Sequence, residues 1–550
     1  MQILSAAEMQ SCDRATAERF GVPTLRLMRA ASAAVADFAR TQFPQARRVT
    51  VLCGRGNNGG DGLMAARMLA TAGLEVTTIL LGSPEDLKGD AAEAWRELSS
   101  PAHGQIHIVL EAAELQRYSD ALTADLIVDA VVGTGFNPPL KGLALEALEW
   151  MRASKAPVLA VDLPSGWPAD ETAATVNAPV YPADAVITFT APKPAHVFGH
   201  LTRRWHQPIV VAPIGSPEEA IVSEQGLHWA GDAMTLVRAP RAAEANKGRF
   251  GHVLVVGGTL GAAGGKAGAP AMAALAALRA GAGLVTAALP AAALPILSSI
   301  APELMTWPLA ANAVGEIAAK GLTSKLITNL LAGKTVLALG PGLGHSAETS
   351  RVAQRLLGAT KMPAVLDADA INILAAKPVL LARFAKERTL VLTPHPGEMA
   401  RLAGMTVAEV QAARLAVARE FAQRHQVTLV LKGARTLVAH PDGRVAVNTT
   451  GNPGMAKGGS GDVLTGLIAG LLAQYPAEPE RAVEAAVYLH GLAADLAVRE
   501  ADEHTVLATD SLQFLAQAFR FESRGRSAYV WLQGIPAMST SAKVLPEASK

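Results

Sequence analysis

The chain has 550 residues, of which half are apolar and 18% are charged, a composition typical of globular α/β domains rather than of a disordered chain. This length excludes a single ordinary core, and we expect two large domains. A formal net charge of +1 and an aromatic content of only 4% give no indication of nucleic acid or an acidic surface as a partner.

The two cysteines, Cys12 and Cys53, lack metal-ligand spacing and are too few for a disulfide framework, so we expect a reducing compartment. The first residues contain no basic region followed by an apolar core, and we therefore predict a cytoplasmic location. An uncharged run from Ala280 to Pro302 is interrupted by Pro290 and Pro295. It predicts a buried strand and a short helix, and we expect no membrane partner.

The first half of the chain shows the alternation of strands and helices. Two helices are predicted over Ser5–Phe20 and Thr24–Phe43, and short β-rich runs separated by helix-length segments follow from Val49. Such alternation predicts a parallel sheet with helices on both faces, a Rossmann-like three-layer α/β/α domain over residues 1–215. The expected strands are Val49–Cys53, Glu75–Leu81, Leu126–Val132, Val158–Leu163, Ala185–Phe189 and Ile209–Ala212.

A second series begins after a predicted connecting segment at residues 216–244. It predicts another three-layer α/β/α domain, over residues 245–521. The expected strands are His252–Val256, Leu284–Ala288, Val336–Leu339, Ala364–Leu366, Leu390–Thr393 and Thr428–Lys432. Pro441–Gly443 lies between two apolar runs and predicts a hairpin, with helices over Val407–His425 and Arg481–Glu500 on either side. Residues 522–550 lose this periodicity and are predicted to form a poorly ordered tail.

The most informative stretch is Gly451–Asp462, which runs straight into an apolar helix. Glycines at Gly458, Gly459 and Gly461 allow backbone N–H groups to converge where the helix begins, and that position favours a phosphate group. Asp462 would lie in the first helical turn, where its carboxylate is placed to accept a proton during phosphoryl transfer. The alternative is a glycine-rich loop before a core helix.

Other loops of the second half carry polar groups at strand ends. Lys432 and Arg435 have the charge needed to neutralise phosphate, and Glu398 is a candidate ligand for hydrated Mg²⁺. His395 is a candidate hydrogen-bonding partner of a substrate, although a single histidine in a turn is commonly structural.

In the first half, three polar stretches lie at the ends of predicted strands: Gly54–Gly62, Asp129–Pro139 and Asp162–Gly166. Open α/β sheets bind ligands at the carboxyl ends of their strands, so these loops are expected to converge. Their side-chain oxygens suit a hard cation. Asp129 and Asp162 should be partly buried, so their charges need a cation or hydrogen-bond donors nearby. Either acid alone could equally cap a helix or brace a turn.

These loops of the first half resemble the epimerase domain of NAD(P)H-hydrate repair enzymes, through Asn57–Asp61, Asp129 with Val131–Gly135, and Asp162–Ser165. The resemblance implies interconversion of the R and S hydrates at nicotinamide C6, with potassium as cofactor. The residues that it places in the potassium site are Asn58, Asp129 and Ser165. The residues that it places in the hydrated-nucleotide site are Asn57, Asn58, Gly59, Gly60, Asp61, Gly133, Thr134, Gly135, Phe136, Asn137, Pro138, Pro139 and Asp162, the last also as a catalytic residue.

The second half resembles the ADP- or ATP-dependent NAD(P)H-hydrate dehydratases of the ribokinase-like superfamily, over about Asn246 to Phe519. The resemblance implies that ADP phosphorylates the C6 hydroxyl of the S hydrate with help from Asp462, and that phosphate then leaves. The run Ala262–Lys266 departs from many relatives. The residues implied for the hydrate site are Ala269, Gly342, His395 and Asp462, and those implied for the nucleotide site are Lys432, Gly433, Ala434, Arg435, Thr436 and Gly461.

Together the two resemblances predict a bifunctional enzyme that acts on NADHX and NADPHX with ADP as co-substrate, and we expect a homo-oligomer. One alternative is a ribokinase-like small-molecule kinase with a Rossmann-like regulatory or binding domain, which would release a stable phosphorylated product. Another is that the first half is a non-catalytic scaffold. The sequence leaves open the choice between ADP and ATP, the preferred hydrate and the number of subunits.

Overall fold

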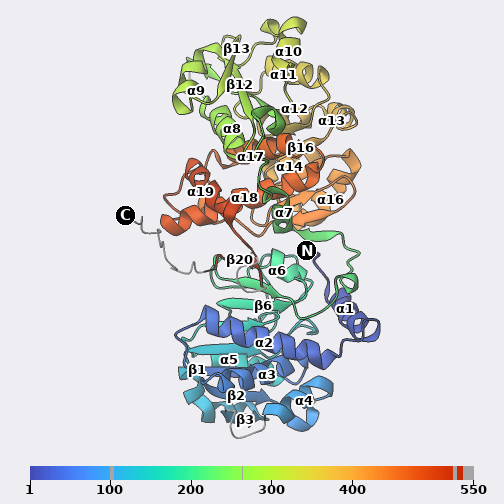
Figure 1. The fold of residues 1–550 in the computed structure, drawn as a ribbon, viewed down its shortest axis with the longest axis vertical. Helices are drawn as coiled ribbons and strands as arrows, with labels where there is room; N and C mark the ends of the chain where they lie inside the picture. Colours follow the sequence, from blue (N-terminus) through green and yellow to red (C-terminus); the bar gives the residue numbers. More distant parts are fainter. Residues whose placement is uncertain (99–103, 263, 524–528, 537–550) are drawn as a thin grey trace. The chain divides into compact units, whose positions relative to one another are not determined.

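The computed structural model describes residues 1–98, 104–262, 264–523 and 529–536, and its internal contacts divide the chain into two compact units (Figure 1). The N-terminal unit consists of Ser5–Ile221 together with the described residues from Glu522 onward. The C-terminal unit consists of Met1–Leu4 and Val222–Phe521. Each unit therefore receives a short segment from the opposite end of the chain.

The N-terminal unit is built on an eight-stranded sheet in the order β20-β7-β6-β5-β4-β1-β2-β3. Every pair in it is parallel except β20 with β7. Its strands are β1 (Arg48–Cys53), β2 (Glu75–Leu81), β3 (Gln105–Val109), β4 (Leu126–Ala130), β5 (Val158–Val161), β6 (Ala185–Phe189), β7 (Ile209–Ala212) and β20 (Val530–Gln533). Its helices are α1 (Ala6–Glu18), α2 (Thr24–Gln42), α3 (Asn57–Thr71), α4 (Gly89–Leu98), α5 (Gly142–Met151) and α6 (Pro194–Phe198).

Alternation along the strands builds two cores, one on each face of this sheet. In β1, Val49 and Val51 pack into the core formed with α2, α3 and α4, whereas Leu52 packs into the core formed with α5. Strands buried on both faces are continuous apolar runs, which explains why most of them could be predicted. The Rossmann-like three-layer prediction is confirmed.

The C-terminal unit is a second three-layer α/β/α structure, with a ten-stranded sheet in the order β13-β12-β9-β14-β15-β16-β17-β18-β19-β8. Its strands are β8 (Leu227–Trp229), β9 (His252–Val256), β12 (Leu284–Pro290), β13 (Met305–Leu309), β14 (Val336–Leu339), β15 (Ala364–Leu366), β16 (Leu390–Leu392), β17 (Thr428–Leu431), β18 (Leu437–Ala439) and β19 (Val445–Val447), with a separate pair β10 (Leu260–Gly261) and β11 (Gly264–Gly265). Its helices are α7 (Met234–Val237), α8 (Gly268–Arg279), α9 (Leu294–Ile300), α10 (Ser324–Leu331), α11 (Ala347–Gly358), α12 (Asp369–Ala375), α13 (Pro378–Ala385), α14 (Pro396–Ala403), α15 (Val407–Ala412), α16 (Arg414–His425), α17 (Ser460–Gln474), α18 (Pro479–Glu500) and α19 (Ala508–Arg520).

Each sheet has one point at which the strand order reverses. In the N-terminal unit the chain runs outward from β1 to β3, returns to β4 beside β1, and then continues in the other direction. In the C-terminal unit the same reversal lies between β9 and β14. Ligands of open α/β sheets bind outside the strand ends at such a point, so the fold gives each unit one preferred binding position.

Helix α17 lies very close to α8 because small residues line their contact. A Cβ added to Gly466 would lie 2.0 Å from the carbonyl oxygen of Ala273, and one added to Gly470 would lie 2.7 Å from that of Ala277. A larger side chain at Gly466 would push the two backbones apart. These glycines therefore fix the position of α17, whose first turn carries Asp462.

Three predicted boundaries are wrong. The tail predicted at 522–550 contains β20, whose apolar residues are buried against β7, while residues 537–550 lie outside the described residues. The predicted connecting segment at 216–244 contains β8 and α7, and the chain passes between units at Ile221. The helix predicted over Val407–His425 is two helices, because Ala413 has φ −134° and ψ 38°.

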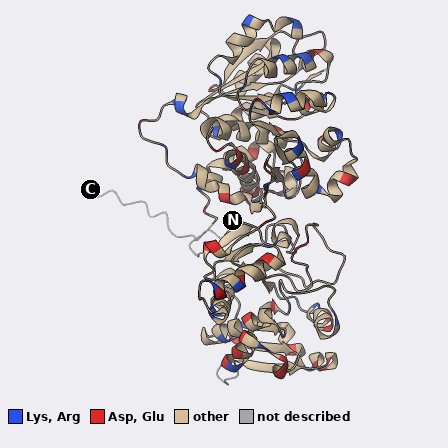
Figure 2. Ribbon diagram, turned by 90° about the vertical axis from the view of Figure 1, so that its right-hand side faces the viewer, with Lys and Arg blue, Asp and Glu red and all other residues tan. Residues whose placement is uncertain are grey.

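The hairpin between β18 and β19 and the strand and short helix predicted within Ala280–Pro302 are confirmed. In the described part of the chain, every helix is too short or too polar to cross a bilayer. Figure 2 shows Lys and Arg interspersed with Asp and Glu along the helices of each unit.

Candidate active sites

The first site lies at the carboxyl ends of β1 and β4 in the N-terminal unit. The sequence had suggested a loop over Gly54–Gly62, but helix α3 begins at Asn57. Its first turns are formed by Asn57, Asn58, Gly59, Gly60 and Asp61. A Cβ on Gly59 would lie 1.9 Å from the carbonyl oxygen of Gly54, and one on Gly54 would lie 2.0 Å from that of Val131. Only glycine permits this approach, which brings α3 against the loop after β4.

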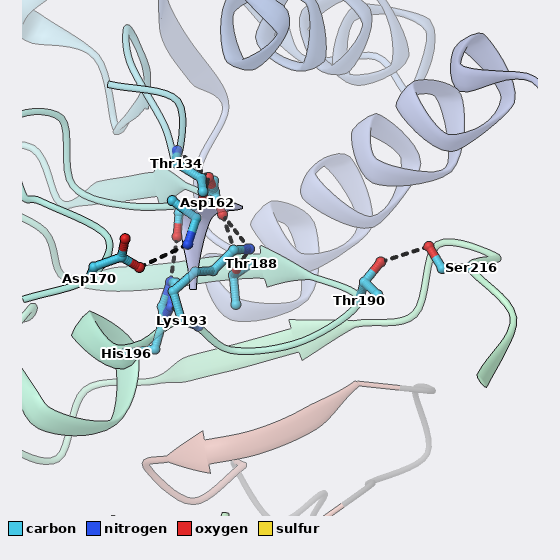
Figure 3. A network of polar contacts seen from close by, with 9 residues as sticks. Thr134, Asp162, Asp170, Thr188, Thr190, Lys193, His196 and Ser216 are labelled. Atoms are coloured by element: carbon cyan, nitrogen blue, oxygen red, sulfur yellow. Dashed lines mark hydrogen bonds and ion pairs between the residues drawn. The ribbon is translucent and has the colours of Figure 1, made fainter. Parts of the chain in front are cut away.

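Asp162 is the centre of a polar network that Figure 3 shows from close by. Its backbone has φ 65°, which is unusual for a residue other than glycine and indicates strain held by the surrounding contacts. The backbone N–H of Thr134 donates to Oδ2 of Asp162 at 2.7 Å, and the Thr134 hydroxyl donates to the same oxygen. The loop after β4 is therefore fastened to the end of β5.

The other carboxylate oxygen of Asp162 is held by a buried lysine. Lys193 Nζ donates to Oδ1 at 3.0 Å and to the hydroxyl of Thr188 at 2.8 Å, and Thr188 donates to Oδ1 at 2.9 Å. The Lys193 side chain is only 2% exposed. Burial alone would raise the pKa of Asp162, but the charge of Lys193 and these hydrogen bonds hold that pKa well below its usual range.

His196 supports this network from the first turn of α6. Its Nδ1 accepts the backbone N–H of Lys193 at 3.0 Å, so the proton is on Nε2, which donates to the Asp162 carbonyl oxygen at 2.7 Å. Burial lowers the pKa of His196 to about 4, and the nearby charge of Lys193 acts in the same direction. His196 is therefore neutral and positions the Asp162 backbone.

Asp129 and Ser165 form a second buried pair beside this network. Ser165 donates to Asp129 through its hydroxyl at 2.6 Å and its backbone N–H at 2.8 Å, and the Val132 N–H donates to the Ser165 hydroxyl at 2.9 Å. Burial raises the pKa of Asp129 to about 6, although the bonds from Ser165 oppose this shift. The carboxylate lacks a cationic partner among the described residues.

Asn58 adds a free amide to these oxygens. Both Oδ1 and Nδ2 are buried and have no hydrogen-bond partner in the described part of the chain. A Cβ on Gly133 would lie 3.1 Å from Asn58 Oδ1 and 2.8 Å from Asp162 Oδ2, so the two side chains flank this glycine. An unpartnered buried amide is costly, and it indicates a group that the protein alone does not supply.

Further acids face the same network. Burial raises the pKa of Asp61 well above its ordinary value, and the charges of Asp162 and Asp13 raise it further. Burial also raises the pKa of Asp13 to about 6. In contrast, Asn137, Pro138 and Pro139 are exposed residues of the loop that carries Gly133, Thr134, Gly135 and Phe136.

The second site lies at the start of α17 in the C-terminal unit. Gly459 precedes the helix with φ 99°, a left-handed conformation that favours glycine, and Gly461 and Asp462 lie in the first turn. A Cβ on Gly461 would lie 3.2 Å from Lys432 Nζ and 3.8 Å from Asp367 Oδ2. The unpaired amides of this helix therefore begin beside a partly buried ammonium group, and both suit an anion.

Lys432 is surrounded by carboxylates. Its Nζ donates to Asp367 Oδ1 at 2.8 Å and lies 3.9 Å from Glu398 Oε2. Thr393 donates to the same Asp367 oxygen at 2.7 Å. Burial alone would lower the pKa of Lys432, but Asp367, Glu398 and Asp462 together raise it. The ammonium group is charged and held in place.

Asp462 has the opposite electrostatic setting from Asp162. Burial raises its pKa to about 7, the charge of Asp367 adds to the shift, and Lys432 opposes it. A carboxyl group with a pKa near neutrality is well matched to accepting a proton from a hydroxyl.

The loop before α17 is tied down at two points. Asp495 accepts the backbone N–H of Gly451 at 2.9 Å and the side-chain amide of Asn452 at 2.9 Å. Lys457 Nζ donates to the carbonyl oxygens of His504 and Val506, each at 2.6 Å. The lysine of this loop therefore fixes its conformation, and Lys432 is the ammonium group that lies beside the helix start.

Two of the residues predicted for the hydrate site, Ala269 and Gly342, lie close together at the reversal point between β9 and β14. Gly342, with φ 63°, lies where an added Cβ would be 3.4 Å from Cβ of Ala269 and 2.8 Å from Cβ of Lys266. Gly264–Gly265 pairs with Leu260–Gly261, so part of the divergent run Ala262–Lys266 forms a small hairpin. Ala269 lies in the first turn of α8.

His395 is the N-cap of α14. Its Nδ1 accepts the N–H of Gly397 at 3.0 Å, and its own N–H donates to Glu398 at 2.8 Å. The ring is half-exposed, with Nε2 3.6 Å from Glu398 Oε1. The histidine is thus a structural cap whose second nitrogen remains close to Glu398.

The predicted nucleotide loop, Lys432–Thr436, joins β17 to β18. Arg414 braces it by donating to the carbonyl oxygens of Leu431 at 3.3 Å and Arg435 at 3.4 Å. Arg435 donates to the Thr449 carbonyl at 3.0 Å. Its guanidinium therefore contacts the chain after β19, and the neutralisation of phosphate by Arg435 stays a prediction.

Several residues of these sites were missed from the sequence. Asp367 and Asp369 follow β15, so the rule that polar groups gather at strand ends would have found both. Lys193 lies farther from the end of β6, and its role depends on its contact with Asp162. Between Asp367 and Asp369, Ala368 has φ 48° and ψ −115°, a strained conformation that supports a functional role for its neighbours. Thr188 lies within β6 and carries no signal of this kind.

Comparison with known proteins agrees with this division. A family profile described as YjeF-related protein N-terminus matches residues 24–195, and one described as NAD(P)H-hydrate dehydratase matches residues 253–517. The bifunctional NAD(P)H-hydrate repair enzyme Nnr of Moorella thermoacetica is 41% identical over 532 residues, which cover 94% of this chain and 97% of the relative. The enzyme of the same name from Escherichia coli K12 is 36% identical, with 92% and 91% covered.

A solved structure of ADP/ATP-dependent NAD(P)H-hydrate dehydratase from Bacillus subtilis, co-crystallised with ATP and Mg²⁺, is 33% identical and covers 52% of this chain and 96% of its own, with a TM-score of 0.44. The relatives that span both units carry one repair-enzyme name, which favours repair over the kinase and scaffold alternatives. This chain belongs to the family of bifunctional NAD(P)H-hydrate repair enzymes.

Proposed function

We propose that this chain repairs hydrated NADH and NADPH in two reactions, one in each unit. The N-terminal unit interconverts the R and S hydrates, and the C-terminal unit dehydrates the S hydrate with ADP, releasing AMP and phosphate. The observation that carries the proposal is the position of Asp462 in the first turn of α17, beside Lys432. The separate polar network around Asp162 supports a second site.

Dehydration begins with the C6 hydroxyl of the S hydrate, because hydroxide itself is a poor leaving group. This oxygen attacks the terminal phosphorus of ADP, its proton passes to Asp462, and AMP leaves. The amides at the start of α17 and the Lys432 ammonium stabilise the transferring phosphoryl group. Electrons from the ring nitrogen then expel phosphate from C6, and loss of a C5 proton restores the double bond.

The placement of Asp462 and Lys432 also indicates which residues bind ADP and the hydrate. Lys432–Thr436 and Gly461 hold ADP, while Ala269, Gly342 and His395 lie around the hydrate. The carboxylates of Asp367, Glu398 and Asp462 gather around Lys432, which supports a site for Mg²⁺ with Glu398 as a ligand. Bound Mg²⁺ would neutralise charge on the nucleotide phosphates.

For epimerisation, Asn58, Asp129 and Ser165 are the proposed potassium ligands. Their fit rests on the unpartnered Asn58 amide and the buried Asp129 carboxylate. Potassium would supply positive charge beside the hydrated ring. Asp162, which is ionised and fixed by Lys193 and Thr134, orients the hydrate, and Asn57–Asp61 and Gly133–Pro139 complete its binding loops.

The proposal is tested by incubating purified protein with mixed hydrate epimers and either ADP or ATP, and by following the recovery of reduced-nicotinamide absorbance. Complete recovery from both epimers, with AMP and phosphate as products of ADP, is expected. Accumulation of a stable phosphorylated product would instead support the kinase alternative. Parallel reactions with NADHX and NADPHX determine the preferred hydrate.

The cytoplasmic location and the homo-oligomeric state belong to the same proposal. Cell fractionation with an antibody against the chain and light scattering of the purified protein would test them. Recovery in a membrane or extracellular fraction, or a monomeric mass at working concentration, would contradict them.

A further inference from the structure

We propose that His228, His440 and Glu484 form a site for a divalent transition metal, with zinc as the ion that suits these ligands best. All three residues belong to the C-terminal unit and none of them takes part in the reactions above. The site is therefore structural, and it does not depend on the proposed function.

The three side chains come from different elements of the unit. His228 lies in β8, His440 begins the turn after β18, and Glu484 lies in α18. Nε2 of His228 and Nε2 of His440 each lie 2.8 Å from Oε1 of Glu484. The two imidazole rings are nearly parallel, with an interplanar angle of 17° and centroids 6.4 Å apart. Both rings therefore direct the same nitrogen toward one carboxylate.

The ligand chemistry fits zinc. Imidazole nitrogen and carboxylate oxygen bind Zn²⁺ at about 2.0–2.2 Å in tetrahedral geometry, which places neighbouring ligand atoms about 3.3 Å apart. The three candidate atoms already lie within 4.8 Å of one another. For this geometry each nitrogen has to move about 0.5 Å away from Oε1, and the two Nε2 atoms have to lie about 3.3 Å apart; rotation of the carboxylate and of the rings can provide this.

Burial and access both suit an ion at this position. The side chains of His440 and Glu484 are 0% and 4% exposed, whereas that of His228 is 20% exposed and leaves a path for an ion and a water ligand. Nδ1 of His440 has no hydrogen-bond partner in the described part of the chain, so no second contact fixes the tautomer of this ring. The ring proton can therefore move to Nδ1 when a metal binds, which leaves the lone pair of Nε2 for the ion.

A metal here would join parts of the unit that are distant in sequence. β8 lies at one edge of the sheet and pairs with β19 on one side. On its other side it holds the first residues of the chain, because Ile3 N–H donates to the Leu227 carbonyl and Trp229 N–H donates to the Met1 carbonyl, each at 3.0 Å. The ion would link this edge, the hairpin turn and α18, and thereby stabilise the folded unit.

The test is zinc binding by the full-length protein after chelator treatment, measured by competition with a chromophoric chelator. The variants are His228→Gln and Glu484→Gln, with His425→Gln as a matched control, since His425 lies on α16 outside the cluster. Replacement by Co²⁺ provides a second readout, the visible spectrum of a four-coordinate site. Circular dichroism in chelator checks that each variant is folded.

One equivalent of zinc is expected in the wild type and in His425→Gln. Binding at least about 100-fold weaker is expected in the other two variants. If the wild type binds no stoichiometric zinc, or if His228→Gln binds it as tightly as the wild type, the proposal is wrong and the three side chains form only a hydrogen-bonded cluster. His228→Gln decides the matter even if Glu484→Gln fails to fold, because His228 is the most exposed of the three.

Discussion

The two units each hold an aspartate near the point where the strand order reverses, but they set its charge in opposite ways. Asp162 is bound by Lys193, Thr134 and Thr188, and its pKa lies well below the usual range. Asp462 lies in the first turn of a helix beside another acid, Asp367, and its pKa is raised to about 7.

This difference separates two roles. A carboxylate that is always ionised and held by several donors can orient a substrate but is a weak proton acceptor. A carboxyl group that titrates near neutrality can accept a proton and release it again in each turnover. We therefore propose that Asp162 positions the substrate and that Asp462 transfers a proton.

The largest expected effect is that of Asp462→Asn on dehydration. Loss of the proton acceptor should lower the dehydration rate by about 10²–10⁴-fold while epimerisation stays unchanged. Single-turnover assays with the S hydrate and ADP measure it. The control is Asp510→Asn, since Asp510 is the corresponding first-turn acid of α19. Near-normal turnover by Asp462→Asn would refute its role as the base.

The second effect concerns the lysines. Lys193→Met leaves the buried Asp162 carboxylate without its cation, and this should destabilise the N-terminal unit by about 3–5 kcal/mol. Lys432→Met should lower the stability of the C-terminal unit by a smaller amount, because the Lys432 side chain is 20% exposed whereas that of Lys193 is 2% exposed. Calorimetric unfolding of the two variants measures both losses of stability. Equal losses would contradict the difference in burial between the two lysines.

The third effect is on the potassium dependence. Epimerisation should require potassium and fail with a large organic cation, whereas dehydration should not depend on potassium through these residues. Ser165→Ala removes the hydroxyl that contacts Asp129, and should weaken the apparent potassium affinity about 10–100-fold. Equal epimerase rates in both cations would argue against the site.

The smallest effect is on the pH profile. Because Asp462 acts only when ionised, kcat/KM for dehydration should rise about tenfold per pH unit up to a pH of about 7 and then level off. The low pKa of Asp162 predicts no such rise in epimerisation from that residue. A dehydration profile that is flat between about pH 5.5 and pH 8 would remove Asp462 as the titrating base.

Sequence patterns predicted the buried parallel strands well but missed strands at the edges of the two sheets. β3 and β13 each lie at one edge of their sheet, and each exposes residues along its length, so neither forms a continuous apolar run. β20 was missed because it is short and follows a polar segment, and its burial depends on the distant strand β7. Such long-range pairing has no local signal.

The site residues likewise divide into those with a local sequence signal and those without one. Asp129, Asp162 and Asp462 were predicted because they lie at the ends of strands or open a helix, positions that local pattern defines. Lys193 was missed because a lysine is usually exposed, and it is buried here only because Asp162 arrives from another strand. Its role comes from the tertiary contact and not from its neighbours in sequence.

The central claim is that the two reactions use separate sites, and Asp162→Asn tests it most directly. This substitution keeps the size of the side chain beside Lys193 but removes its charge. With mixed epimers and excess ADP, a time course resolved by chromatography should show the S hydrate repaired at the normal rate while the R hydrate persists, apart from slow spontaneous interconversion. If the folded variant instead removes both epimers equally slowly, the two units do not work as separate sites.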